Sequence, residues 1–199
     1  MLAIFPAHSF GASMINQMKP VRRVVTGNDA QGRSRVLYDG PAPNTVPRPE
    51  NPRAGMTDLW VYQQSPAPLS GERDDGALPY HFEPPSAGGH LRIVQSTKPP
   101  PGYDQSKDPS YVPFHEPRVR DDGVLVRGGQ SAHTSAMHKS ETVDYGIMLA
   151  GERVLVLDTQ TLVMKPGDVV VQLGNWHLWS SERSDVTMAF VMMGAKFDE

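Results

Sequence analysis

The sequence predicts an all-β fold in which short antiparallel strands close into a barrel. After residue 122, apolar runs of four to nine residues rich in valine, leucine and methionine alternate with short turns, several of which contain glycine. Short strands at regular spacing with such turns are typical of barrels and sandwiches. No segment shows a sustained helical period or a capping box that leads into one.

The composition bounds the class of protein and its partners. The 199 residues, 38% hydrophobic and 21% charged, suit one domain with a sizeable core. No apolar run approaches the roughly 18 residues that cross a bilayer, so we expect no membrane partner. The chain has no cysteine, which excludes thiolate chemistry and fits a reducing compartment, so we expect a cytoplasmic protein. A net charge of −3 with mixed signs argues against nucleic acid and favours a small-molecule substrate.

The amino terminus, residues 1–19, is predicted to be a flexible or subunit-contacting arm. It holds Lys19 as its only base, and a proline and a glycine interrupt its apolar residues. A secretory signal needs an early positive charge and an unbroken apolar centre, and a transit peptide needs several arginines. We therefore expect neither, and Met14 and Met18 stand as alternative natural starts.

The prolines divide the chain. Of 19 prolines, 18 lie between Pro6 and Pro117, and only Pro166 comes later. Because proline lacks the N–H that a central ladder needs, the strand-sized runs of this half suit edge or wrapping strands. We expect residues 20–122 to wrap the core barrel of residues 123–199 within the same domain.

Several strands of the second half are apolar on both faces. Between Arg153 and Asp158, one face holds Val154 and Val156, and the opposite face holds two leucines. A barrel whose outer face contacts water would show alternating apolar and polar residues along its strands, so another part of the protein must cover these strands. The proline-rich half, a second subunit, or both would do so, and we expect a homodimer.

The segment MHKSETVDYGIMLAG, residues 137–151, carries a ladder of polar side chains. On a single strand, alternate side chains share one face. That face would carry His138, Ser140, Thr142, Asp144, Gly146 and Met148. Polar groups inside a barrel are costly unless they bond one another, a metal or a substrate. We therefore interpret this face as the lining of a site.

A second segment, KPGDVVVQLGNWHLWSSE, adds to the same site. A Pro166-Gly167 turn feeds a strand, a further turn follows, and His177 begins the next strand. Trp179 shares the strand parity of His177, and we expect it to form an apolar wall of the pocket with Met148.

The order of these features resembles the cupin family. That family's first motif is a His-x-His pair, a Glu three or four residues on, and a Gly seven residues after the Glu. Here His138, Ser140, Asp144 and Gly151 hold those places. The resemblance covers roughly residues 123–195 and implies a jelly-roll barrel.

The second cupin motif has a glycine, a His three residues on and later an Asn. This chain offers Gly174, His177 and Ser181 at those places. The Lys165-Pro166-Gly167-Asp168 turn strengthens the resemblance.

The resemblance implies two alternatives for the chemistry. The family's metal is held by three histidines and a glutamate, of which His138, Asp144 and His177 remain here. Such a two-histidine, one-carboxylate set holds iron(II) or similar divalent ions, so Fe, Mn, Zn or Ni is implied as a cofactor. In the metal-free alternative, the same three residues act as acid and base. Either way the substrate pocket would include Ser140, Thr142, Met148 and Trp179.

The resemblance extends to stand-alone small-molecule cupins, among them cupin-domain oxidoreductases encoded with fungal polyketide and salicylaldehyde-type pathways. It implies an oxidoreductase or a lyase of the dehydratase type that acts on an oxygenated polyketide or aromatic metabolite. The alternatives are a non-catalytic cupin that binds or senses a metabolite, and a structural assembly unit. Since one fold carries many activities, the site has to decide among them.

Overall fold

The chain is described by a computed structural model that covers residues 17–69 and 71–197. Within these ranges it forms fourteen strands and two short 3-10 turns, and the predicted all-β fold is confirmed. The strands are β1 (Arg22–Asn28), β2 (Ser34–Pro41), β3 (Asn44–Arg48), β4 (Asn51–Tyr62), β5 (Gly89–Ser96), β6 (Arg118–Val119), β7 (Leu125–Val126), β8 (His138–Lys139), β9 (Thr142–Ala150), β10 (Arg153–Val156), β11 (Thr161–Met164), β12 (Val169–Leu173), β13 (Leu178–Ser180) and β14 (Val186–Gly194). The 3-10 turns are η1 (Asp75–Ala77) and η2 (Gln105–Lys107).

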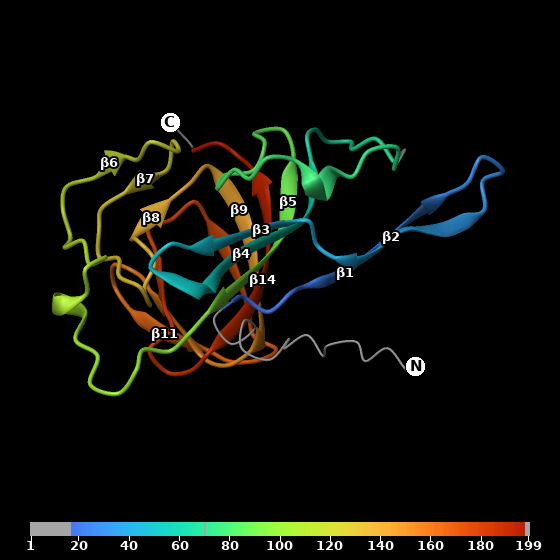
Figure 1. Ribbon diagram of the computed structural model, residues 1–199. Coiled ribbons are helices and arrows are strands. Elements are labelled where there is room, and N and C mark those ends of the chain that lie inside the picture. The colour runs from blue at the N-terminus through green and yellow to red at the C-terminus, as the bar shows by residue number, and fades with distance from the viewer. Residues whose placement is uncertain (1–16, 70, 198–199) are drawn as a thin grey trace, which may run out of the picture.

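One large antiparallel sheet forms a wall of the barrel, with strand order β12-β9-β14-β5-β4-β3. The smaller sheet β11-β10-β13 and the short strands β6, β7 and β8 close the other side (Figure 1). The register of the large sheet places Asp144 of β9 between Gln172 of β12 and Met192 of β14. Residues directly opposite in an antiparallel pair point to the same face, so these three share the inner side.

The proline-rich half supplies strands to the large sheet. β5, which has no proline, lies between β14 and β4, and β3 with Pro47 lies at the edge. β4 contains Pro52, but its pairing with β5 begins only at Gly55. The prolines thus avoid the positions where a ladder bond is needed on both sides.

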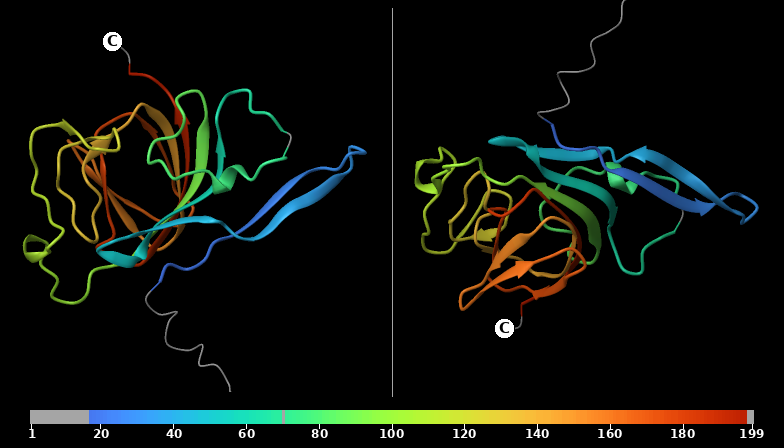
Figure 2. Two further views of the ribbon diagram at one scale, coloured as in Figure 1. Left: turned by 45° about the horizontal axis from the view of Figure 1, so that its top comes forward. Right: turned by 90° about the horizontal axis from the view of Figure 1, so that it is seen from below.

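A hairpin of β1 and β2 projects away from the barrel as a separate two-stranded sheet (Figure 2). Of the predicted arm, residues 1–16 lie outside the described residues. Met18 is buried, and its Sδ lies 2.6 Å from where a Cβ on Gly55 would stand.

The barrel core is rich in methionine and aromatic side chains. Its main cluster of buried residues comprises Val94, Met148, Leu155, Met164, Trp179, Val186, Met188, Phe190 and Met192. In β10, Val154 and Leu155 point to opposite faces and both are buried, so this strand is covered on both sides. No helix within residues 17–69 and 71–197 has the length and the apolar character that a membrane crossing requires.

The outer face of β9 and β12 is different, because it remains exposed in the single chain. Large apolar side chains at least a third exposed there are Tyr145, Leu149, Val169, Val171 and Leu173. β12 is also an edge strand, whose unpaired backbone groups can pair with another chain.

Candidate functional site

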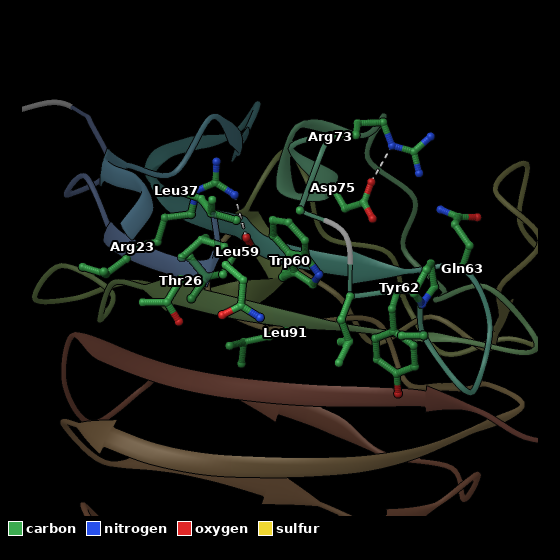
Figure 3. A pocket seen from close by; sticks show the side chains of 18 of the residues that line it. Arg23, Thr26, Leu37, Leu59, Trp60, Tyr62, Gln63, Arg73, Asp75 and Leu91 are labelled. Carbon is green, nitrogen blue, oxygen red and sulfur yellow. Dashed lines mark hydrogen bonds and ion pairs between the residues drawn. The ribbon is translucent and has the colours of Figure 1, made fainter. Parts of the chain in front are cut away.

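A cavity of about 840 Å³ lies outside the barrel (Figure 3). It is bounded by β1 of the hairpin, by β4 and by the segment that follows β4. Its charged groups have partners: Arg73 Nε lies 2.5 Å from Asp75 Oδ1, and Arg23 Nη1 donates to the carbonyl oxygen of Leu59 at 3.0 Å. None of the site residues predicted from the sequence lines it, so the candidate chemistry lies elsewhere.

Four of the predicted residues, His138, Asp144, His177 and Trp179, instead line a smaller cavity of about 70 Å³ inside the barrel. It has two walls, the inner face of the large sheet and the opposing strands β8, β10 and β13. The lining residues are Met56, Phe82, Arg92, Val94, Ser135, His138, Asp144, Arg153, His177, Trp179, Phe190 and Met192. A neighbouring cavity of about 300 Å³ shares half of these residues and adds the polar side chains Arg48, Glu50, Arg120 and Asp122. The two cavities adjoin, and the larger one provides room for a ligand beside the inner cavity.

His138 and His177 form a pair held by the backbone. Each donates its backbone N–H to the other's carbonyl oxygen, at 2.9 and 3.0 Å, and their ring centroids lie 4.3 Å apart. The Nδ1 atoms lie 2.8 Å from the Ala136 carbonyl and 2.9 Å from the Asn175 carbonyl. Because a carbonyl oxygen only accepts, each Nδ1 carries the hydrogen and each Nε2 keeps a free lone pair in the neutral ring.

Burial keeps both rings neutral. It lowers the pKa of His138 to about 4, opposed in part by the bond to Ala136. Burial, and then the neighbouring His138, lower the pKa of His177 to about 3. At neutral pH the pair therefore presents two uncharged imidazoles that accept hydrogen bonds through Nε2.

Asp144 lies on the opposite wall, in the middle of the large sheet. Its side chain is buried, and its Oδ1 has no hydrogen-bond partner within the described chain. Burial raises the pKa of this carboxyl group to about 6, although the Thr142 hydroxyl opposes the rise. Near neutral pH, Asp144 therefore exchanges readily between its protonated and ionised forms.

The three predicted metal ligands do not gather around one point. Within residues 17–69 and 71–197, no three His, Asp or Glu side chains are close enough together to hold one ion. The two histidines are adjacent, but Asp144 belongs to the facing wall, and its short side chain does not complete the set. This arrangement does not fit a three-ligand ion on His138, Asp144 and His177, so no catalytic step is derived through a metal.

The predicted continuous ladder of residues 138–148 is wrong. β8 pairs with β7, whereas β9 belongs to the large sheet, and the chain changes sheets at Ser140 and Glu141. The reason lies in the partners of Glu141, whose carbonyl accepts from Ala195 N–H and whose side chain accepts from Phe197 N–H. The strand therefore cannot continue its pairing with β7.

The break also relocates part of the predicted pocket. Ser140 and Thr142 are buried and bond each other, with their hydroxyl oxygens 2.8 Å apart, and neither lines the barrel cavity. Met148 lies in the main apolar cluster. Trp179 does line the cavity, with its ring edge-on to His177 at a centroid distance of 6.4 Å.

Arg153 lines the cavity as well, although it is not among the site residues predicted from the sequence. It begins β10 directly after a glycine turn, where a charged residue suggests a solvated corner. The available signal was strand parity. Arg153 shares its face with Leu155, which is buried opposite Trp179, and an arginine on such a face requires an explanation.

Comparison with known proteins gives relatives by sequence. No protein-family model matches the chain. Two curated relatives are named cupin-domain oxidoreductases, virC of Hypocrea virens and fogC of Aspergillus ruber. The first is 32% identical over 53% of this chain and 57% of its own length, and the second is 23% identical over 87% and 72%. The chain is thus similar to cupin-domain proteins.

Another curated relative of this chain is the phomopsin biosynthesis cluster protein D of Diaporthe leptostromiformis. It is 34% identical over 118 residues, which are 54% of this chain and 61% of that protein. The chain thus spans about three fifths of the length of this relative. Among solved structures, the EutQ protein of Clostridium difficile has 10% identity and a TM-score of 0.41, and the match covers 87% of this chain and 97% of that one.

Proposed function

We propose that this cupin domain is an enzyme of secondary metabolism that moves protons on a small oxygenated organic molecule inside the barrel. The observation that carries the proposal is the meeting of the neutral His138 and His177 pair and Asp144 in one cavity of the barrel. The biosynthesis cluster and oxidoreductase names of the relatives support the choice of metabolite class.

The three residues have complementary roles in this proposal. A histidine Nε2 accepts a proton from the substrate, because each Nδ1 already donates to a carbonyl. Protonated Asp144 donates to a developing oxygen anion, since its pKa of about 6 lies close to neutral pH. Phe82, edge-on to the His138 ring at 5.5 Å, and Trp179 keep water from the reacting atoms.

Proton exchange tests this proposal directly. The protein is incubated in D₂O with a panel of β-keto esters and hydroxylated aromatic aldehydes and ketones, and deuterium uptake is followed by mass spectrometry. We expect the wild type to accelerate exchange of at least one panel member. H138Q and H177Q should lower that rate by about 10²-fold or more, as for other general acid–base residues.

The matched control is H133Q. His133 bonds the Thr97 carbonyl through Nδ1 at 2.8 Å and does not line the barrel cavity, so its exchange rate should equal that of the wild type. Equal rates for the wild type, H138Q and H177Q would refute the proposal.

A metabolite-binding cupin without turnover is the second candidate. The low pKa values of both histidines favour it, because weakly basic imidazoles accept hydrogen bonds better than protons. Tight binding of a panel compound with no deuterium uptake would select this candidate.

The homodimer predicted from the sequence remains a proposal, and the exposed apolar face of β9 and β12 supports it. A second copy of the chain would bury Val171 and Leu173, now 54% and 73% exposed. We expect V171K/L173K to shift the protein from dimer to monomer in light scattering. A control change on the projecting hairpin, V36K, should leave the mass unchanged, and a monomeric wild type would contradict the prediction.

A further inference from the structure

Arg153 carries a buried charge with no carboxylate partner within the described chain. Its side chain lies in the barrel cavity, and the residue is only 6% exposed. Its Nε has no hydrogen-bond partner, and its Nη1 contacts only the Met188 sulfur, at 3.6 Å. The guanidinium carbon stands 5.2 Å from the centre of the Trp179 ring. An isolated charge in such surroundings is costly unless an anion joins it.

Three acidic residues beside Arg153 in the chain or at the mouth of the cavity are paired with other arginines. Glu152, its chain neighbour, pairs with Arg183. At the mouth of the cavity, Glu50 pairs with Arg48, and Asp122 pairs with Arg120. None of these three acids forms an ion pair with Arg153.

The two remaining charged groups of the inner cavity do not neutralise Arg153. Arg92 is bound by Asp58 in a buried pair, and Asp144 forms no ion pair with Arg153. Burial, and then the nearby Arg48, lower the pKa of Arg153 to about 9. The guanidinium therefore remains charged at neutral pH and has no ion-pair partner among the described residues.

The backbone fixes Arg153 in this position. Gly151, with φ +79°, forms the turn before β10, and a Cβ there would come within 2.1 Å of the Asp185 carbonyl oxygen. The Glu152 N–H donates to Ser184 Oγ at 2.6 Å, and Arg153 then pairs with Met164 of β11. The side chain is held facing the cavity before any ligand arrives, which lowers the cost of binding.

We infer that the barrel cavity binds a small carboxylate-bearing molecule whose anion pairs with Arg153. A planar guanidinium matches the two oxygens of a carboxylate. Trp179, Phe190 and Phe82 provide apolar walls, which fit an aromatic or alicyclic body. The ligand has to carry its negative charge when it binds, because the Arg153 guanidinium lacks an ion-pair partner before any reaction takes place. The inference rests on the proposed function only in placing substrate and ligand in the same cavity.

Pairs of carboxylates and their neutral amides test the inference without any need for turnover. The probes are benzoate with benzamide, cyclohexanecarboxylate with its amide, and phenylacetate with its amide. Melting temperatures and titration calorimetry report binding to the wild type, R153M and the control R22M. We expect at least one carboxylate to bind the wild type about tenfold or more tightly than its amide, as for hydrogen bonds to charged groups.

R153M should lose this preference and bind acid and amide alike. R153M should also melt above the ligand-free wild type, because methionine removes the uncompensated charge. R22M, which removes an exposed arginine of the projecting hairpin, should keep the preference.

Two results would overturn the inference: no carboxylate binding more tightly than its amide, or an R153M protein that keeps the preference. The proposed proton chemistry fails separately. If H138Q and H177Q exchange deuterium like the wild type while R153M loses the carboxylate preference, the function is refuted and the ligand class stands.

Discussion

Replacing Arg92 with methionine should lower the free energy of unfolding by about 3 to 5 kcal/mol, the range found when one member of a buried ion pair is removed. Arg92 and Asp58 are 2% and 1% exposed. Two bonds join them, Nε to Oδ1 at 2.6 Å and Nη2 to Oδ2 at 3.2 Å. The same guanidinium donates to the carbonyls of Phe82, at 2.9 Å, and His81, at 2.6 Å. Methionine leaves the Asp58 charge and both carbonyls without these donors.

Urea unfolding measures this effect, and two further variants define its cause. R22M removes an exposed arginine whose pair with Asp39 is largely solvated, so its stability should change by less than about 0.5 kcal/mol. The double variant R92M/D58L should recover part of the loss, because no unpaired charge remains, while the two carbonyls stay unsatisfied. A loss below about 1 kcal/mol in R92M, or a double variant no more stable than R92M, would contradict this account.

Replacing Asp144 with asparagine should stabilise the protein at pH 7 and abolish the proposed proton transfer. Burial raises the pKa of Asp144 from 3.8 to about 6, so ionising it in the folded chain costs about 2 to 3 kcal/mol more than in the unfolded chain. Asparagine has a similar shape and carries no charge. For a chain of this size, we expect the melting temperature to rise by about 5 to 10 °C.

The pH dependence of this gain has a definite sign. A folded pKa above the unfolded one means that the wild type binds its proton more tightly when folded, and loses stability as pH rises from about 4 through about 6. The advantage of D144N should therefore be absent below pH 4 and complete above pH 7. His138 and His177, whose pKa values are lowered, destabilise both proteins equally on acidification. The difference between the two melting curves isolates Asp144, and a constant difference from pH 3 to pH 8 would contradict the prediction.

The sequence predicted those parts of the candidate site that local pattern controls. His177 and Trp179 share a strand parity, and both reach the barrel cavity. His138 reaches it too, although the ladder that carried the argument breaks after Lys139. Ser140 and Thr142 do not line the cavity, because the chain changes sheets there to bond the carboxyl-terminal segment. Such a change of partner depends on contacts more than fifty residues away in the chain, which periodicity does not reveal.

Arg153, by contrast, lines the cavity although the sequence pattern did not predict it. Its position beside a glycine turn is readable in the sequence, but its lack of a partner depends on where Glu50, Asp122 and Glu152 find theirs. Two of those pairs join residues two positions apart in the chain, whereas Glu152 pairs with the distant Arg183. Only the assembled barrel shows that these three acids pair elsewhere and that Arg153 has no ion-pair partner among the described residues.

By itself the sequence determined the class of fold, because alternating apolar runs and glycine turns leave antiparallel strands as the way to bury apolar surface. The uneven distribution of prolines also has a physical explanation. The central strand β5 has no proline, the proline of β3 lies on an edge strand, and the proline of β4 precedes the pairing of β4 with β5. The tertiary structure alone decided which polar side chains face one another across the barrel. It brought His138 and His177 together, held Asp144 on the facing wall, and buried Arg153 without an ion-pair partner among the described residues. The burial and pairing of charges depend on distances that a linear pattern does not contain.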